Sequence, residues 1–257
     1  MLLQTGMSYS VESYFADAQQ VSAAIADAEE MLPQIGLRAS EAADLTVRIA
    51  RAQMSEGAWR LQIVPNEGSI TISASDAEGA RCGLYDALEV LGIRWFAPTR
   101  PPTLPLLPVT LEATDRTVRP SFGYRGLHIC AGSHHYDAQV GRWMSRLGMN
   151  RKLTHHEEID VLGDKLQARG LEPDTAVHSF ALWVPDDPHF GQHPEWFSQV
   201  GGRRIRHSEG GQLCVSNPQM RAQICDAIEA WVAEHPSVRV VGIAPNDGYG
   251  WCECEAC

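Results

Sequence analysis

The 257-residue sequence lacks any long apolar run, any basic segment and any abundance of aromatic residues, which make up 7% of it. A membrane-spanning helix takes about 18 or more consecutive apolar residues, so the first absence excludes a transmembrane helix. The net charge is −11, and acidic residues outnumber basic ones in both halves. Binding to nucleic-acid phosphates or to an anionic membrane surface needs a basic segment, so we expect neither partner.

Several short motifs are also missing. The first residues show no basic start followed by an apolar stretch, so no signal peptide is visible and a cytoplasmic location is the default expectation. The sequence has no glycine-rich phosphate loop, no Walker motif and no Gly-x-Ser-x-Gly elbow, which disfavours a kinase, a dehydrogenase or a serine hydrolase. Hydrophobic residues make up 44% of the chain, enough for one large or two medium domains with real cores.

Cysteine is the residue type with the most uneven distribution. There are seven, an odd number, and three of them lie in the last six residues as Cys252, Cys254 and Cys257. A disulfide framework is therefore disfavoured against reduced thiols or a metal site. Zinc prefers four soft ligands in a tetrahedron, and Cys214 or His207 would supply the fourth ligand of a structural site. The alternative is a set of reduced loop thiols without an ion.

The pattern of residues 1–100 predicts a small α+β domain. Apolar residues recur at helical spacing over 18–32, and alternation indicates strands over 45–49, 59–64 and 69–73. The last two are joined by turn residues and form a predicted hairpin. The spacing of Ser75 and Glu78 is that of a capping box, which would begin a helix that Gly92 ends, and 93–96 is a predicted short strand.

The segment 101–119 is predicted to be an extended connector. Five prolines lie in the segment from Pro98 to Pro108, and proline lacks the amide donor and fixes φ.

After Pro120 strands and helices alternate, with strands predicted over 122–130, 149–154, 171–178 and 238–244. Strand–helix alternation is typical of a parallel sheet, and both a barrel and an open doubly wound sheet fit it.

Polar and aromatic side chains follow the ends of these strands, where parallel α/β folds place their functional residues. Polar side chains can hydrogen-bond the hydroxyls of a sugar and aromatic rings can stack on its faces, so this edge is predicted to bind a sugar. Two candidates have structural alternatives: Arg125 as an internal ion-pair partner and Asp247 as part of a plain Pro-Asn-Asp-Gly turn. The candidate sugar-binding residues are Arg125, His128, His178, Asn246, Tyr249 and Trp251, with the histidines His134, His135, His155 and His156 at the same strand ends.

Two groups of motifs resemble known families. The runs 79–85 and 91–98 resemble the non-catalytic α/β domain that precedes the barrel in α-glucuronidases and β-N-acetylhexosaminidases, and 122–128 resembles their first barrel strand. More specific motifs resemble the family called domain of unknown function 4838, from which glycoside hydrolase family 163, of endo-β-N-acetylglucosaminidase activity, is drawn. These motifs are His193-Pro-Glu-Trp-Phe197, Gln212-Leu-Cys-Val-Ser-Asn-Pro218, Pro245-Asn-Asp-Gly248 and Cys252-Glu-Cys-Glu-Ala-Cys257.

The resemblance implies an α/β fold class: a small α+β N-terminal domain followed by roughly half of a (β/α)8 TIM-type barrel, its first four β/α units, over 120–257. It implies a glycoside hydrolase-like protein that acts on or binds N-acetylglucosamine-containing glycans and requires no cofactor. Asp247 would be the general acid or the carboxylate that orients the substrate acetamido group. The alternatives are a non-catalytic carbohydrate-binding module and an α-glucuronidase-like hydrolase.

The length departs from this family pattern. A complete barrel takes about 250 residues, whereas 138 residues follow residue 119. We therefore expect an incomplete barrel that lacks a second catalytic carboxylate, as in a fragment. Open sheet edges and exposed apolar surface favour self-association through the barrel edge or pairing with another chain.

Overall fold

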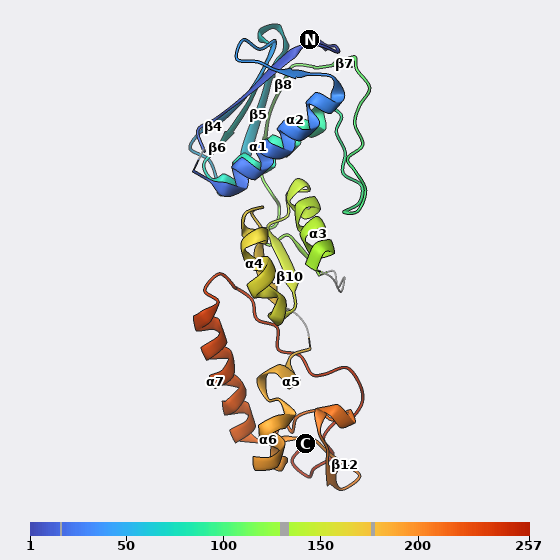
Figure 1. The fold of residues 1–257 in the computed structure, drawn as a ribbon. Coiled ribbons are helices and arrows are strands. Elements are labelled where there is room, and N and C mark those ends of the chain that lie inside the picture. Colours follow the sequence, from blue (N-terminus) through green and yellow to red (C-terminus); the bar gives the residue numbers. More distant parts are fainter. Residues whose placement is uncertain (16, 129–133, 176–177) are drawn as a thin grey trace. The chain divides into compact units, whose positions relative to one another are not determined.

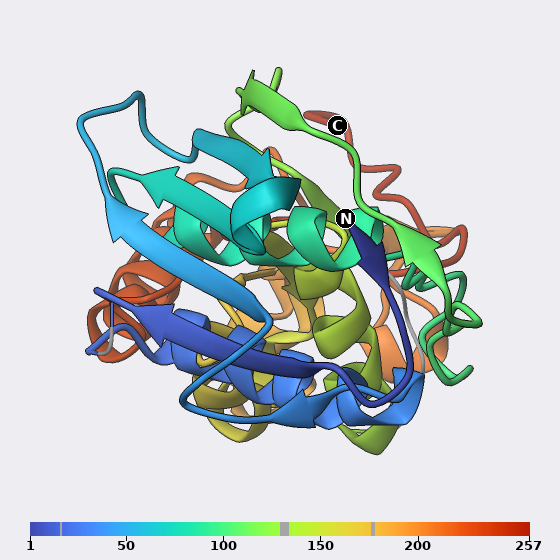
Figure 2. The ribbon, with the colours of Figure 1, turned by 90° about the horizontal axis from the view of Figure 1, so that it is seen from above.

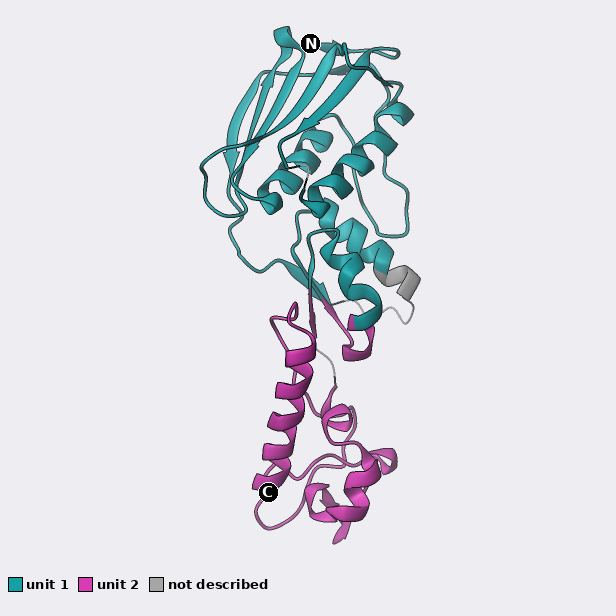
Figure 3. Ribbon diagram, turned by 60° about the vertical axis from the view of Figure 1, so that its left-hand side comes forward, with its two compact units in different colours: residues 1–152, 160–172 teal, residues 153–159, 173–257 magenta. Residues whose placement is uncertain are grey.

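The computed structural model describes the chain except for residues 16, 129–133 and 176–177, and of residues 134–137 it describes the backbone. The chain forms two compact units (Figure 3). The first unit comprises 1–152 and 160–172, and the second comprises 153–159 and 173–257. Their limits differ from the predicted domain limits because residues after 101 contribute strands to the first unit.

The first unit is built on a six-stranded sheet of order β3-β2-β4-β6-β5-β8. Neighbours from β3 to β6 are parallel, whereas β5 is antiparallel to both β6 and β8. The predicted hairpin is confirmed as β5 and β6. Part of the predicted connector instead forms the edge strand β8. The strands are β2 (Ser8–Ser13), β3 (Arg38–Ala39), β4 (Leu45–Arg51), β5 (Trp59–Val64), β6 (Ser69–Ala74) and β8 (Thr114–Val118), with a separate pair of β1 (Leu2–Leu3) and β7 (Val109–Thr110).

Two helices, α1 (Gln19–Met31) and α2 (Ala77–Val90), lie on one face of this sheet (Figures 1 and 2). Alternate strand residues such as Val47, Leu61 and Ile72 are buried in the same apolar core as the inner faces of both helices. The predicted helix over 18–32 is confirmed by α1. Burial of alternate strand positions beneath amphipathic helices is what the apolar spacing of the sequence specifies.

The start of α2 differs from the predicted capping box. The N-cap is Asp76, whose Oδ1 accepts a hydrogen bond from the Gly79 N–H at 2.8 Å. Its Oδ2 also accepts from the Gly57 N–H at 2.8 Å. Glu78 forms an ion pair with Arg125. The capping role predicted for Ser75 is therefore wrong, because a carboxylate one residue later takes the helix donors.

Gly83 of α2 lies where the helix approaches the sheet closely. A Cβ at this position would lie 2.3 Å from Cγ2 of Ile72 and 3.1 Å from the ring of Trp59. In an open helix, glycine to alanine stabilises by about 1 kcal/mol. Overpacking costs about 1–3 kcal/mol, so we expect Gly83→Ala to lower the free energy of unfolding by about 1–2 kcal/mol in urea titrations.

The matched control is Gly191→Ala in α6 (Asp186–Gln192), where nothing lies within 4 Å of the added methyl group. This variant should be neutral or stabilised by up to about 1 kcal/mol. Equal stabilisation by the two substitutions would contradict the close packing of α2 on the sheet.

Residues 126–175 continue the alternation of strands and helices, and the limits of the two units divide this segment. Three short strands lie side by side in the order β11-β10-β9. They coincide with three of the predicted strands, of which residues 129–130 and 176–177 lie outside the described residues. The elements are β9 (Gly126–His128), α3 (His134–Arg146), β10 (Arg151–Thr154), α4 (Ile159–Gln167) and β11 (Glu172–Thr175).

The second unit consists mainly of helices packed on a small apolar core around Trp183, Phe197, Leu213 and Met220. Asn217 caps α7, because its side chain accepts hydrogen bonds from the backbone N–H groups of Gln219 and Met220. Besides α6, its elements are α5 (Phe180–Trp183), α7 (Pro218–Glu234), β12 (Gln199–Val200) and β13 (Arg203–Arg204), with short 3-10 turns over Pro194–Trp196 and His207–Glu209.

Two predicted strands do not form regular strands. The segment 238–244 makes two isolated parallel bridges, Thr175 with Val241 and His178 with Ala244. The segment 93–96 makes one bridge, between Arg94 and Thr103. The direction of the predicted fourth strand is therefore right, but its ladder is incomplete. Among the described residues, no helix is both long enough and apolar enough to cross a bilayer.

Candidate functional site

The loop 245–251 of the second unit carries the predicted acid. Nε2 of His178 lies 3.1 Å from Oδ1 of Asp247, and Nδ1 of the same ring lies 2.6 Å from the carbonyl oxygen of Pro245. The parallel bridge between His178 and Ala244 places the two partners at the same strand end. The Asp247 side chain is 90% exposed and that of His178 is 53% exposed. The pair is therefore accessible to a ligand.

The contacts of His178 determine where a proton must lie. A carbonyl oxygen can only accept, so Nδ1 carries a hydrogen and donates it to Pro245. The other ring nitrogen, Nε2, then faces Oδ1 of Asp247. The Pro245 carbonyl thus orients the His178 ring toward the carboxyl group of Asp247.

We expect long-range 1H–15N spectra to show a protonated Nδ1 in His178. In Asp247→Asn, the amide N–H can donate to Nε2, so Nδ1 should keep its hydrogen. A neutral Nε2–H tautomer in the unsubstituted protein would contradict the hydrogen bond to Pro245.

Asn246 is half-buried and is held by hydrogen bonds of its backbone and its side chain. Its backbone N–H donates to Oε1 of Gln212 at 2.9 Å, and its carbonyl accepts from Nε2 of the same residue at 2.7 Å. Its side-chain Oδ1 accepts from the Ala181 N–H at 3.3 Å, and Nδ2 lies 2.8 Å from Nδ1 of His207. These contacts fix the loop at the residue before Asp247. A sugar-binding role for Asn246 stays a prediction.

Gln212 and His207 hold this loop, although no pattern in the sequence connects either residue to it. Gln212 is fully buried, and it begins one of the motifs that carry the family resemblance. That motif was the available signal, but nothing in it indicates a partner 34 residues away.

The same loop presents two aromatic side chains to solvent. Tyr249 is 91% exposed and Trp251 is 55% exposed. Aromatic faces beside a carboxylate form the surface on which a sugar ring can stack while its hydroxyls hydrogen-bond. The structure therefore brings together His178, Asn246, Asp247, Tyr249 and Trp251 in and around one loop.

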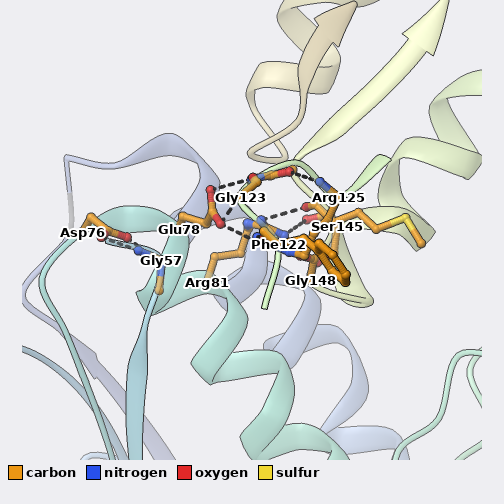
Figure 4. Close-up of polar contacts among 12 residues, drawn as sticks. Gly57, Asp76, Glu78, Arg81, Phe122, Gly123, Arg125, Ser145 and Gly148 are labelled. Atoms are coloured by element: carbon orange, nitrogen blue, oxygen red, sulfur yellow. Dashed lines mark hydrogen bonds and ion pairs between the residues drawn. The ribbon is translucent and has the colours of Figure 1, made fainter. Parts of the chain in front are cut away.

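Arg125 and His128 belong to the first unit. The guanidinium of Arg125 forms an ion pair with Glu78 and donates to the carbonyls of Gly148 and Phe122 at 2.9 and 2.7 Å (Figure 4). The internal ion pair, one of the two alternatives for this residue, is thus present. Arg125 also lines a cavity of about 470 Å³ with Glu78 and Asn150, and its sugar-binding role stays a prediction.

Of the other strand-end histidines, the structure describes the side chains of His128, His155 and His156. His128 ends β9 and is exposed. His156 is buried against Trp183 and Trp231, and burial lowers its pKa. The side chains of His134 and His135 lie outside the described residues. His156 is therefore a core residue rather than part of an accessible site.

Four cysteines form a second cluster close in sequence to the loop. The sulfur atoms of Cys214, Cys252, Cys254 and Cys257 all lie within 4.8 Å of one another. Burial raises the pKa of the Cys214 thiol to about 12, whereas the backbone N–H of Cys257 helps to lower the pKa of Cys254 to about 6. His207, the alternative fourth ligand, instead bonds the Val184 carbonyl at 3.0 Å. Such a thiol cluster can bind a metal ion.

Comparison with known proteins gives a family and a fold. The profile of the family described as domain of unknown function (DUF4838) matches residues 102–257. Among the curated proteins, none matches the sequence. Several glycoside hydrolases of known structure share the fold, at low sequence identity.

Three of these structures illustrate the likeness. A family GH20 exo-β-N-acetylglucosaminidase from Vibrio harveyi, in complex with N-acetylglucosamine, aligns with 100% of this chain and 46% of its own (TM-score 0.60, 14% identity). An N-acetyl-β-hexosaminidase from Streptomyces plicatus aligns with 90% of this chain and 53% of its own, with a TM-score of 0.60 and 15% identity. A family GH115 4-O-methyl-α-glucuronidase with specificity for decorated arabinogalactans aligns with 69% of this chain and 30% of its own, with a TM-score of 0.55 and 14% identity.

The predicted fold class is confirmed. The chain is mixed α/β, with a sheet-rich N-terminal region and parallel strands, and its neighbours are TIM-barrel glycoside hydrolases matched over part of their chains. The chain spans about half or less of each of these three neighbours.

Proposed function

The chain belongs to the DUF4838 family, and from this premise we propose that it is a glycoside hydrolase-like protein that acts on N-acetylglucosamine-containing glycans. The observation that carries the proposal is the exposed His178–Asp247 pair, with two exposed aromatic side chains on the same loop as Asp247. The likeness to N-acetylhexosaminidases, one of them holding N-acetylglucosamine, supports the substrate class.

In this proposal Asp247 works on the glycosidic bond or the acetamido group. Hydrolysis needs two carboxyl functions, or one carboxyl group and the acetamido group of the substrate itself. As general acid, Asp247 gives its proton to the departing oxygen. As orienting group, it accepts a hydrogen bond from the acetamide N–H and holds the amide oxygen against the sugar carbon. His178 holds the carboxyl group in place, and Trp251 and Tyr249 offer faces for stacking.

A non-catalytic sugar-binding role is the second candidate. Two exposed aromatic side chains on one loop serve binding whether or not a second carboxyl function is present. The likeness to a family GH115 enzyme keeps a glucuronide as the alternative substrate class. Self-association through an open barrel edge and a location in the cytoplasm stay predictions.

The test compares binding and turnover on the same purified chain. We expect saturation-transfer NMR to detect binding of N,N′-diacetylchitobiose, and an aryl β-N-acetylglucosaminide to be hydrolysed above the buffer rate. An aryl α-glucuronoside is the matched substrate control. Binding without hydrolysis assigns the sugar-binding role, and preference for the glucuronoside assigns the alternative substrate. If the chain neither binds nor hydrolyses any of the three compounds, the proposal is overturned.

A further inference from the structure

We propose that Cys214, Cys252, Cys254 and Cys257 bind one Zn²⁺ ion in a closed structural site. This inference goes beyond the proposed function, since it concerns how the second unit holds its C-terminal segment. The three closely spaced cysteines follow the loop 245–251 directly, whereas Cys214 precedes α7. The ion would connect two segments that are 38 to 43 residues apart in the sequence.

The separation of the sulfur atoms fits a tetrahedral ion. Zinc–thiolate bonds of about 2.3 Å place the sulfurs of a tetrahedron about 3.8 Å apart. Sγ of Cys214 lies 3.7 Å from Sγ of Cys254 and 3.7 Å from that of Cys257. All pairs of the four lie within 4.8 Å. A disulfide requires about 2.05 Å, and all four cysteines are free.

The cluster is also surrounded by hydrogen-bond donors that suit thiolates. The backbone N–H of Gln199 donates to Sγ of Cys252 at 3.3 Å, and Nη1 of Arg204 lies 3.7 Å from the same sulfur. The hydroxyl of Ser216 lies 3.1 Å from Sγ of Cys257. Four thiolates around Zn²⁺ leave a net charge of −2, which donors and the Arg204 cation stabilise.

Four protein ligands leave no open position for water, so the site is structural rather than catalytic. Each thiol releases its proton to solvent as its sulfur binds the ion, and no redox step is involved. The ion would reinforce two backbone hydrogen bonds, Glu253 N–H to Gln199 at 2.7 Å and Gln212 N–H to Gly250 at 3.1 Å. It thereby fixes the base of the loop that carries Asp247.

Metal analysis of the purified 257-residue chain tests the proposal. We expect about one zinc per chain by elemental analysis after growth with added zinc. Cys254→Ser should lower the zinc content at least about tenfold, since even the loss of an outer-shell partner lowers metal affinity about 10–100-fold. The matched control is Cys225→Ser, which changes an exposed cysteine of α7 outside the cluster and should keep the zinc. Iron in place of zinc, or less than about a tenth of an equivalent of zinc, overturns the proposal.

Cobalt binding keeps the test valid if Cys254→Ser fails to fold. Adding Co²⁺ to the metal-stripped chain should produce the intense visible bands of a tetrahedral thiolate complex, and Zn²⁺ should abolish them. Cys257→His retains four ligands, so it should bind Co²⁺ with a shifted spectrum. Pale octahedral cobalt spectra in both proteins would overturn the site. Hydrogen exchange at Glu253 should rise on zinc removal, and unchanged exchange would contradict the link to the loop.

Discussion

Replacing Asp27 with alanine is expected to lower the free energy of unfolding of the first unit by about 3–5 kcal/mol, the cost of breaking a buried ion pair from one side. The Asp27 side chain is 1% exposed. Its Oδ1 accepts from Arg142 at 2.7 Å and from Arg169 at 3.0 Å, and its Oδ2 accepts from Arg146 at 2.9 Å. The hydroxyl of Tyr85 donates to Oδ2 at 3.0 Å.

This one carboxylate joins several helices of the first unit. Asp27 comes from α1, Tyr85 from α2, and Arg142 and Arg146 from α3. Without Asp27, these guanidinium groups would stay partly buried without their anion. The loss of unfolding free energy in Asp27→Ala is therefore larger than the number of broken hydrogen bonds alone would suggest.

Urea unfolding measures the effect, with Glu30→Ala as the matched control. Glu30 also pairs with Arg142, but its side chain is 55% exposed. Exposed ion pairs contribute about 0–1 kcal/mol, so the control should change stability by no more than that. Equal losses in the two variants would contradict a buried hub at Asp27.

The effect should depend on pH in a defined direction. Burial by itself raises the pKa of Asp27, but the hydrogen bond from Arg142 and the charges of Arg146 and Arg169 outweigh it and hold the pKa below 3.8. The folded pKa thus lies below the unfolded one. The stabilisation is complete above the unfolded pKa of about 3.9 and is lost as the pH falls through the folded pKa. The difference between the protein and Asp27→Ala should therefore shrink below about pH 4.

Asp247→Asn is expected to lower the hydrolysis of N-acetylglucosaminides by about 10²–10⁴-fold, the usual contribution of a positioned acid or base. The substitution keeps the shape of the side chain. It replaces the carboxyl group by an amide, which can neither give a proton as an acid nor carry a negative charge. Substrate binding should change little, because Tyr249 and Trp251 remain. Steady-state turnover and NMR binding measured on the same samples separate the two effects.

The leaving group distinguishes the two roles proposed for Asp247. A nitrophenolate departs without a proton, so loss of a general acid should affect a nitrophenyl glycoside far less than chitobiose. Loss of an acetamide-orienting carboxylate should affect both substrates alike. Asp226→Asn, the same change on an exposed position of α7, is the control. Undiminished turnover of both substrates in Asp247→Asn would remove this residue from the mechanism.

Local sequence signals predicted the elements that local interactions form. The turn residues between 64 and 69 specified the hairpin of β5 and β6, and the apolar spacing over 18–32 specified α1. The strands β2 and β8 were not predicted because their hydrogen-bond partners lie far away in sequence. The capping prediction for 75–78 failed for a related reason, since Glu78 pairs with a residue 47 positions later.

Residue order alone determined that Asp247 follows a strand end and that three thiols are close enough to share an ion, because neighbouring residues cannot separate far in space. The tertiary structure decided the partners: His178 for Asp247, Gln212 for Asn246, and Cys214 as the fourth sulfur. It also gathered three arginines around Asp27. Chain folding sets such contacts between distant segments, and a linear pattern of residue types does not encode which distant group will satisfy a buried charge.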